Sequence, residues 1–251
     1  MDNNKSKPVI QLNEICRDFI VGEETVHALR NVSFSINEGE FVTIMGTSGS
    51  GKSTLLNILG CLDTPTSGEY LLDGVPAKKM SKNERAVLRN RKIGFVFQNY
   101  NLLAKTTAIE NVELPLLYNS EVNGKERRER ATEALTQVGL ADRMLHKSNQ
   151  MSGGQMQRVA IARALVNDPA VILADEATGN LDSRTSFEIL TLFQKLHRAG
   201  KTIIFVTHNA EIAKYCSRNL FLKDGKLVED TSNVNILDAE TTLKSLPKEE
   251  D

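Results

Sequence analysis

The sequence lacks both the long apolar run that crosses a bilayer and the apolar core of a signal peptide. No stretch of its 251 residues approaches the roughly 20 apolar residues that a membrane-spanning helix requires. The first ten residues, MDNNKSKPVI, contain no apolar core. We therefore expect a chain with neither a membrane span nor a secretory leader.

Cysteine is scarce, and neither sign of charge dominates. The three cysteines, Cys16, Cys61 and Cys216, are far apart and form no CxxC pair. This favours buried, free thiols in a reducing cytosol over disulfides or a zinc site. With 31 basic and 32 acidic residues, the chain has no overall basic field, which argues against nucleic acid as its main partner. No internal repeat is evident.

Short apolar runs alternate with helical patterns along most of the chain. The runs are rich in β-branched and aromatic residues, which suits strands covered on both faces. Asp-Gly pairs within 71–76 and 221–228 indicate hairpins, and so some antiparallel structure at the edges. The alternation predicts an α/β fold with a mainly parallel sheet. The four apolar runs are FVTIMG at 41–46, IGFVF at 93–97, VILAD at 171–175 and TIIFVT at 202–207.

The middle of the chain has helical periodicity without strand signals. Residues 109–118 read as a helix disturbed by Pro115. Residues 125–139 read as a helix with one apolar face, which Gly139 ends. We interpret about 100–160 as a helical lobe inserted into the α/β core.

The two ends of the chain are polar. We expect the tails at 1–7 and 231–251 to be loosely ordered. The folded domain is accordingly predicted to span 8–230.

The segment Gly46–Ser53, GTSGSGKS, matches the phosphate-binding pattern GxxxxGK[ST]. It follows an apolar strand and precedes a helical stretch, which is the context that the pattern requires. Its glycines let the backbone aim N–H groups at phosphate oxygens, beside a helix N-terminus that favours anions. Lys52 would reach the β- and γ-phosphates of ATP, and the Ser53 hydroxyl would bind Mg²⁺. The expected ATP contacts in this loop are Gly46, Thr47, Ser48, Gly49, Ser50, Gly51, Lys52, Ser53 and Thr54.

Two carboxylates follow one another at the end of the apolar run 171–175. Asp175 suits a Mg²⁺ ligand at the end of a buried strand. Glu176 would lie toward the γ-phosphate and orient the attacking water. The alternative is that the Asp-Glu pair only caps the next helix. The phosphate loop upstream favours the catalytic interpretation.

The run Met151–Gln155, MSGGQ, opens a helix before this strand, and about 20 residues separate Gln155 from Asp175. Ser152 and Gln155 match an S-x-x-Q capping box. Gly153 and Gly154 leave the helix N-terminus unobstructed, so that its N–H groups and dipole form a second phosphate site. One nucleotide does not need two such sites in one chain. We therefore expect two copies arranged head to tail, each offering this helix end to the other's γ-phosphate.

Together with Gln98 and His208, these three motifs resemble the ATPase cassette of ABC transporters over about residues 8–230. The resemblance implies an α/β P-loop NTPase (RecA-like) core with a mainly parallel sheet, an antiparallel β subdomain and an inserted α-helical lobe. It also implies that two cassettes sandwich two ATP molecules with Mg²⁺, and that closure and hydrolysis move attached membrane subunits.

Four further residues take family roles by their position. Gln98 resembles the loop glutamine that links the helical lobe, Mg²⁺ and the membrane subunit, and His208 resembles the switch histidine that contacts the γ-phosphate. Asp182 resembles the loop aspartate that crosses the dimer interface, and Phe19 the aromatic residue, usually tyrosine, that stacks on adenine. Taken alone, Gln98 would be an ordinary loop residue and His208 an ordinary helix cap.

The resemblance thus sorts the candidate residues by role. The catalytic residues are Glu176, His208, Lys52 and Gln98. The metal ligands are Ser53, Gln98 and Asp175. The contacts to the partner's ATP are Ser152, Gly153, Gly154, Gln155 and Asp182, and Phe19 joins the phosphate loop in binding the chain's own ATP.

Two residues depart from the family pattern. Met151 stands where leucine is usual, which nearly conserves side-chain volume. Ala177 stands where proline is common after the glutamate, so we expect a looser turn around Glu176 with no chemical group lost. Neither departure indicates an inactive enzyme.

Longer stretches narrow the resemblance to one branch. Residues 57–70, 96–116 and 177–182 resemble lipoprotein-release (LolD-type) and macrolide-export (MacB-type) ATPases, with cell-division (FtsE-type) cassettes close by. Membrane subunits in this branch often transmit force to periplasmic domains. The branch implies export, lipoprotein release or mechanotransmission. A cassette without membrane segments implies that the permease is a separate chain, or that a fused permease has been cut away.

The expected partners are a second copy of the same chain and separate transmembrane permease subunits, with a periplasmic adaptor left open and no nucleic acid. The expected location is the cytoplasm, peripheral on the cytoplasmic face of the inner (plasma) membrane. One alternative is a non-transport ABC ATPase acting on DNA or ribosomes, although the sequence shows no long coiled coil and only one cassette. Another is a regulatory cassette that does not hydrolyse ATP, or an FtsE-like cell-division regulator.

Overall fold

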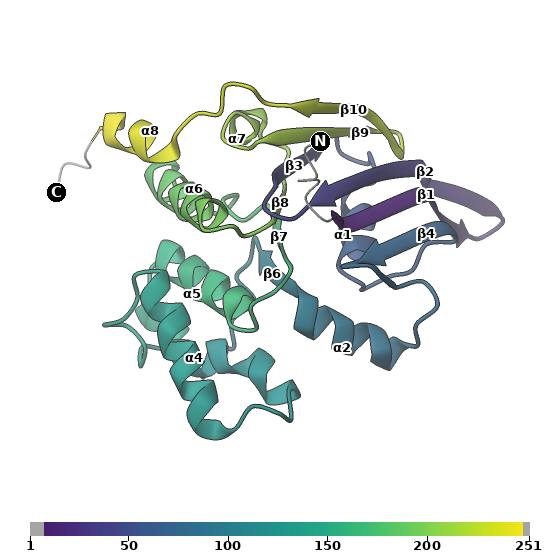
Figure 1. Cartoon of the computed structure of the whole chain (residues 1–251). Helices are drawn as coiled ribbons and strands as arrows, with labels where there is room; N and C mark the ends of the chain where they lie inside the picture. Colours follow the sequence, from purple (N-terminus) through teal and green to yellow (C-terminus); the bar gives the residue numbers. More distant parts are fainter. Residues whose placement is uncertain (1–7, 248–251) are drawn as a thin grey trace, which may run out of the picture.

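The computed structural model describes residues 8–247, which form two β-sheets with helices packed against them (Figure 1). The expected loose tail at 1–7 lies outside the described residues, as does the end of the second tail. The strands are β1 (Pro8–Val21), β2 (Glu24–Asn37), β3 (Phe41–Gly46), β4 (Ser67–Leu72), β5 (Val75–Pro76), β6 (Ile93–Phe97), β7 (Val171–Asp175), β8 (Ile203–Val206), β9 (Arg218–Lys223) and β10 (Lys226–Ser232). The helices are α1 (Lys52–Leu59), α2 (Lys82–Lys92), α3 (Ala108–Glu113), α4 (Gly124–Gln137), α5 (Gly153–Leu165), α6 (Ser183–Arg198), α7 (Ala210–Ala213) and α8 (Ala239–Ser245), with the 3-10 turns η1 (Leu114–Tyr118) and η2 (Ser148–Gln150).

The larger sheet has six strands in the order β10-β9-β3-β8-β7-β6. Strands β9, β3, β8, β7 and β6 run parallel to one another, and β10 is antiparallel to β9. The apolar runs in the sequence coincide with β3, β6 and β7 and contain β8. Because packing covers both faces of this sheet, its central strands are apolar throughout. The prediction of a mainly parallel α/β sheet is confirmed.

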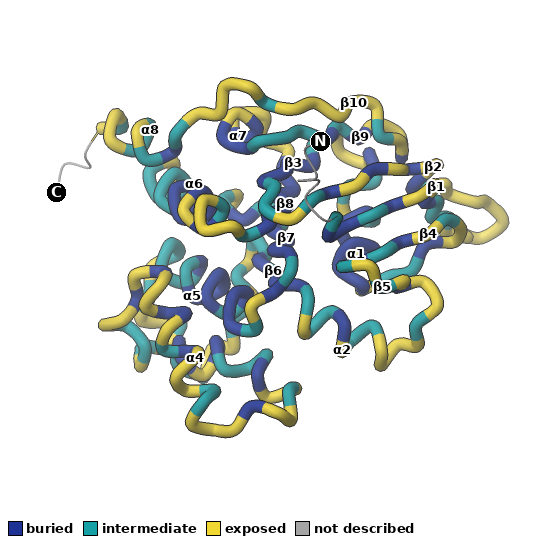
Figure 2. Tube along the Cα trace, in the orientation of Figure 1, coloured by how far each residue is buried: buried dark blue, intermediate teal, exposed yellow. Residues whose placement is uncertain are grey.

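The smaller sheet, in the order β2-β1-β4-β5, is antiparallel. It packs with α1 and one face of the larger sheet around a cluster that includes Ile10, Leu55 and Ile204. The other face of the larger sheet packs on the helices α3 to α6, around a cluster that includes Ile161 and Phe193. Figure 2 shows the buried parts of the chain concentrated in these layers. The sheet is therefore held between an antiparallel β layer and a helical layer.

Asp-Gly pairs close both hairpins that the sequence predicts. Asp73-Gly74 joins β4 to β5, and Asp224-Gly225 joins β9 to β10. All four residues have positive φ, between 48° and 78°, which two-residue turns between antiparallel strands require. The longer β1–β2 hairpin carries no Asp-Gly signal at its turn.

The helical lobe is inserted in the chain between β6 and β7, and Figure 1 shows its helices α4 and α5 at the lower left, away from the smaller sheet. Helix α3 gives way to the turn η1 at Pro115, as the disturbed pattern at 109–118 predicts. Helix α4 ends just before Gly139, which has φ 77°. Helix α5 returns to the sheet so closely that a Cβ on Gly94 of β6 would lie 2.4 Å from the Ala164 carbonyl oxygen. The inserted lobe is thus anchored on β6 through a glycine contact.

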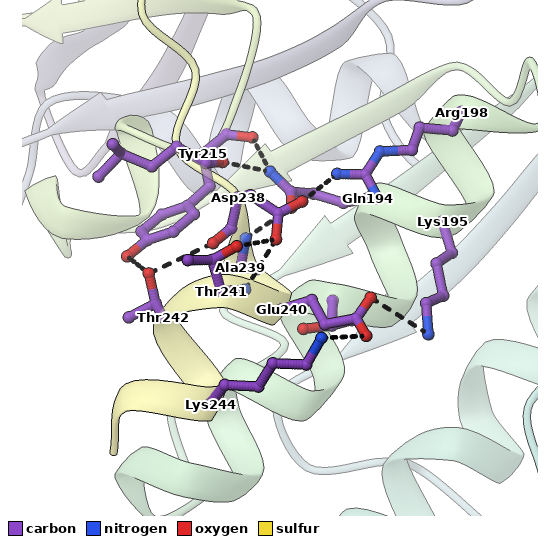
Figure 3. Close-up of polar contacts among 12 residues, drawn as sticks. Gln194, Lys195, Arg198, Tyr215, Asp238, Ala239, Glu240, Thr241, Thr242 and Lys244 are labelled. Carbon is purple, nitrogen blue, oxygen red and sulfur yellow. Dashed lines mark hydrogen bonds and ion pairs between the residues drawn. The ribbon is translucent and has the colours of Figure 1, made fainter.

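The segment after β10 differs from the loosely ordered tail expected at 231–251. Its helix α8 packs on α6, and a network of side chains holds it there (Figure 3). The Gln194 amide donates to the carbonyls of Tyr215 and Leu237, at 2.9 and 2.8 Å, and accepts from the Ala239 N–H at 2.8 Å. Ala239 is fully buried. Tertiary partners on α6 therefore order a segment whose polar composition predicts loose structure.

No helix among residues 8–247 is both long enough and apolar enough to cross a membrane. Cys61 and Cys216 are buried and Cys16 is half-buried, all as free thiols. Burial raises the pKa of Cys61 to about 11, although the nearby Arg89 lowers it in part. The thiols are thus free as expected, and two of the three are buried.

Candidate active site

The predicted phosphate loop and the predicted catalytic and metal-binding residues gather at one edge of the larger sheet, where four parallel strands end side by side. Strand β3 ends at Gly46, β6 at Phe97 and β7 at Asp175, while His208 follows β8. The register pairs Phe97 with Asp175, and Asp175 with Val206. In parallel α/β sheets, ligands bind beyond the carboxyl ends of the strands. Topology therefore brings together residues that are up to 162 positions apart, from Gly46 to His208.

The loop between β3 and α1 turns sharply because glycines occupy its crowded positions. A Cβ on Gly46 would lie 2.3 Å from the Leu222 carbonyl oxygen, and one on Gly51 would lie 2.6 Å from the Ala28 carbonyl oxygen. Gly51, with φ 101°, is also the N-cap of α1, and no side chain caps this helix. The first N–H groups of α1 are thus left for a ligand, and the helix dipole favours an anion there.

Lys52 folds back over this loop. Its Nζ donates to the carbonyl oxygens of Gly46, at 2.7 Å, and Thr47, at 2.8 Å. Ser48 and Ser53 are exposed, whereas Ser50 is buried. The loop therefore offers solvent an ammonium group, the hydroxyls of Thr47, Ser48 and Ser53, and free helix N–H groups, which is the chemistry that binds phosphate.

Asp175 and Glu176 leave the sheet at the end of β7. Burial and the neighbouring Glu176 carboxylate raise the pKa of Asp175, and Lys52 offsets part of this rise. Glu176 has φ 44° and donates its N–H to the Val206 carbonyl oxygen at 2.9 Å. This left-handed conformation costs on the order of 1 kcal/mol or more for a residue with a side chain. The next helix, α6, is capped by Asp182, so the alternative that the Asp-Glu pair caps it is wrong.

His208 contacts Glu176 directly. Its Nδ1 lies 2.7 Å from Glu176 Oε1, and the two side chains are 70% and 26% exposed. Helix α7 is capped by Asn209, so the alternative role of His208 as a helix cap is wrong. A carboxylate thus lies against an accessible imidazole at the end of β7, and both are side chains of the kind that transfer protons in general acid–base catalysis.

Gln98 points toward the segment that follows Glu176. Its Nε2 donates to Asn180 Oδ1 at 3.0 Å, and Asn180 Nδ2 donates back to the Gln98 carbonyl at 3.2 Å. A Cβ on Gly179 would lie 2.7 Å from Gln98 Nε2, so this glycine makes room for the glutamine. The structure therefore joins Gln98 to the loop before Asp182, and shows no bond from its amide to Asp175.

The start of α5 forms the predicted capping box. Ser152 accepts from the Gln155 N–H at 3.2 Å, and the Gln155 side chain accepts from the Ser152 N–H at 3.0 Å. The glycines between them are crowded within the chain itself: a Cβ on Gly153 would lie 2.9 Å from the Tyr100 hydroxyl. One on Gly154 would lie 2.5 Å from a methyl carbon on α6. Internal packing is thus a second reason for glycine here, beside the open helix end.

Comparison with known proteins assigns the chain to a family. The family profile described as ABC transporter matches residues 29–179, which is more than half of the sequence. The chain belongs to the ABC transporter family. An uncharacterized ABC transporter ATP-binding protein of Thermotoga maritima is 56% identical over 88% of this chain and 94% of its own length.

Two other relatives link the cassette to solved structures and to larger proteins. The ATP-binding cassette MJ0796 of Methanocaldococcus jannaschii has been solved as a dimer in a post-hydrolysis state with ADP and Pi. It matches with a TM-score of 0.80 and 48% identity, covering 89% of this chain and 98% of that one. The macrolide export ATP-binding/permease protein MacB of Brucella melitensis is 48% identical over 97% of this chain but only 37% of its own length.

The cassette is an ATP-binding ATPase subunit. Two of the residues predicted to contact ATP, Asp182 and Phe19, already interact with other residues of the chain. Asp182 accepts from the Thr185 N–H at 2.8 Å, and the bonds from Thr185 lower the pKa of Asp182. Phe19 is 38% exposed, and the Arg17 guanidinium lies 4.5 Å from the centre of its ring. Arg17 is in turn paired with Asp63 at 2.8 Å. A cation thus already covers part of the Phe19 ring.

The ABC cassette also contains site residues that sequence patterns miss. Asn180 binds Gln98, and Gln157 on α5 is buried against the strand ends. Asn180 lies beside a glycine in a loop, and Gln157 interrupts an apolar helix face with an amide. The position of Gln157 could have been noticed in the sequence, because a glutamine on a buried helix face needs hydrogen-bond partners.

Proposed function

We propose that two copies of this cassette close head to tail around two ATP molecules, hydrolyse them and drive a separate membrane permease. The observation that carries the proposal is the Glu176–His208 contact at the strand ends beside the phosphate loop. Within the described chain, the capping residues Ser152 and Gln155 bond to each other. The N-terminal end of α5 is therefore left for a second molecule. The solved dimer of MJ0796 supports the pairing of two cassettes.

In this proposal each residue of the site has one task in hydrolysis. The phosphate loop, which begins at Gly46, and the Lys52 side chain hold the phosphates, since N–H groups and an ammonium stabilise the charge that develops on them. Glu176 takes a proton from the attacking water, and His208 orients Glu176 and contacts the γ-phosphate. The partner's Ser152 end completes the site only when the dimer closes.

Mg²⁺ fits the oxygen groups that the start of α1 and the end of β7 offer. Ser53 and Asp175 offer a hydroxyl and a carboxylate, which are ligands that this ion prefers. A cation there would offset the burial and the Glu176 charge that raise the pKa of Asp175. No group of three or more His, Cys, Asp or Glu side chains that could hold a metal occurs among residues 8–247, so ATP and water would supply the other ligands. Gln98 would join after releasing Asn180, and the ion would neutralise phosphate charge.

A groove between α2, β6 and η1 is the surface that we assign to the permease. Its volume is about 880 Å³, and its lining includes Val87, Phe97 and Tyr118. Val87 is 55% exposed and Tyr118 is 82% exposed, so apolar surface is open to a partner. Because Phe97 directly precedes Gln98, a permease segment seated here would move the loop that reaches the ATP site.

This groove favours a transport role over action on DNA or ribosomes. MacB is a macrolide export ATP-binding/permease protein, which supports export as the transport role. In our proposal the cassette acts on the cytoplasmic face of the inner membrane, by transport or by force transmission, with a periplasmic adaptor as an additional partner. A regulatory cassette without hydrolysis is disfavoured because Glu176 and His208 are both in place.

The Glu176→Gln variant tests the hydrolytic assignment. It should bind ATP as the wild type does, hydrolyse it far more slowly and accumulate as an ATP-bound dimer in size-exclusion chromatography. Wild-type phosphate release by this variant would contradict the role of Glu176.

The Ser152→Arg variant tests the head-to-tail arrangement. It should abolish hydrolysis while the monomer keeps nearly unchanged ATP affinity, because Ser152 contacts only the partner's nucleotide. An equal loss of ATP binding would mean that Ser152 serves its own site.

A further inference from the structure

Gln157 on α5 is a buried polar side chain that the proposed mechanism leaves without a role. It is 0% exposed. Its Nε2 donates to the Ala177 carbonyl oxygen at 2.7 Å and lies 3.4 Å from the Phe97 carbonyl oxygen. Its Oε1 is also buried and has no hydrogen-bond partner in the described part of the chain. An unpaired buried oxygen is costly, so packing alone does not account for a glutamine here.

The two carbonyl contacts settle how the amide is oriented. A carbonyl oxygen only accepts, so the amide nitrogen must face both Ala177 and Phe97, and the oxygen must point away. An apolar side chain of similar size would fill the same space without an unpaired oxygen. What it would lose is the donor to the two backbone carbonyls.

These carbonyls belong to the residues beside the proposed catalytic groups. Ala177 follows Glu176 and is 2% exposed, and Phe97 precedes Gln98. The Glu176 turn has two other restraints: the Glu176 N–H donates to β8, and its carbonyl accepts from the Gly179 N–H at 2.8 Å. The hydrogen bond from Gln157 to the Ala177 carbonyl is a third restraint on this turn. It supplies a restraint at Ala177, where the sequence lacks the proline that would stiffen the backbone.

Gln157 also connects this turn to the surface proposed for the partner. It lies two residues after Gln155, on the helix whose first turn would contact the partner's ATP. A helix moves as a stiff unit, so a shift of α5 on dimer closure would reach Glu176 through this amide.

We infer that Gln157 is a positioning residue, which holds Glu176 in line with the attacking water and links that alignment to the partner contact of α5. The inference rests on the proposed function, because it needs Glu176 as the base.

The test measures ATP hydrolysis and ATP binding in Gln157→Leu and Gln157→Met. Both side chains keep the approximate volume, and neither can donate a hydrogen bond to the two carbonyl oxygens. We expect kcat to fall by about 10- to 100-fold in both, because a displacement of about 1 Å at a reacting group has that effect. The KM for ATP should stay within about twofold, since the phosphate loop is untouched. Both variants should also accumulate the ATP-bound dimer.

Gln194→Leu is the matched control. Gln194 is a second buried glutamine, 5% exposed, whose Nε2 also donates to two backbone carbonyls, those of Tyr215 and Leu237. Because it holds α8 and not the Glu176 turn, its loss should lower the melting temperature and leave kcat near the wild-type value.

The outcomes separate this inference from the proposed function. Unchanged kcat in both Gln157 variants, with Glu176→Gln inactive, overturns the positioning role and leaves the catalytic assignment intact. Wild-type hydrolysis by Glu176→Gln overturns the proposed function itself. Loss of ATP binding in both Gln157 variants, or an equal loss of kcat in Gln194→Leu, assigns Gln157 to folding alone and also overturns the inference.

Discussion

Replacing Gly154 with alanine tests why the start of α5 contains glycine. The added Cβ would lie 2.5 Å from Thr185 Cγ2, whereas the next nearest Thr185 atoms are at 3.9 and 4.0 Å. Real Cβ atoms do not approach so closely, and the β-branched threonine has little rotamer freedom on a helix. Helix α5 or α6 must therefore shift. Overpacking of this kind costs about 1–3 kcal/mol, against which alanine gains up to about 1 kcal/mol of helix propensity.

We expect Gly154→Ala to lower the free energy of unfolding by about 1–2 kcal/mol, which is the overpacking cost less the gain in helix propensity. Urea unfolding followed by circular dichroism measures it, and phosphate release measures the ATPase activity. Thr185→Ser removes only the clashing methyl carbon, so the double variant should regain most of the lost stability. Gly124→Ala on α4 is the control, because its Cβ would meet only Arg127 Nη2, at 3.6 Å.

Two results would refute this reasoning. One is wild-type stability in Gly154→Ala, and the other is a double variant no more stable than the single one. A double variant that regains stability but not ATPase activity would assign Gly154 a separate role at the partner's nucleotide.

Two further predictions concern acid stability and thiol reactivity. The Thr241 N–H and the Arg198 guanidinium hold the pKa of Asp238 down at about 2, so its contribution to docking α8 is complete above the unfolded pKa of about 4. It should be lost as the pH falls from there toward 2. Asp238→Asn should flatten that part of the stability–pH curve, and an unchanged curve would contradict the link. In a thiol-reagent titration of the native protein, the half-buried Cys16 should react first, because burial raises the pKa of Cys61 to about 11; fast reaction of all three thiols would show that the core opens readily.

Local sequence determined the strands, the Asp-Gly hairpins, the phosphate loop and the helix cap, because each depends on residues that are close together in the chain. The apolar runs mark the buried parallel strands, because both faces of such a strand are covered. The two Asp-Gly pairs mark hairpins because their turns need positive φ. The spacing of glycines, Lys52 and Ser53 marks the phosphate loop, since each group must meet a phosphate within one turn of chain. The capping box of Ser152 and Gln155 is equally local.

The contacts that organise the site depend on distant parts of the chain. Gln98 binds Asn180, and Gln157 binds Ala177, across 82 and 20 positions respectively. No spacing rule connects such pairs, because sheet register and the insertion of the helical lobe bring them together. The order of α8 was missed for the same reason: its polar sequence forms a helix there because Gln194 satisfies its backbone.

The sequence by itself therefore determined the fold class, the phosphate loop, the carboxylates after β7 and the family. Short-range sterics and hydrogen-bond chemistry leave fixed patterns in the chain. Only the tertiary structure decided that Glu176 meets His208, that Gly154 must be small because α6 lies against it, and that Gln157 touches the turn after Glu176. These are consequences of which strands lie side by side, and the free energy of that arrangement is shared by residues from all parts of the chain.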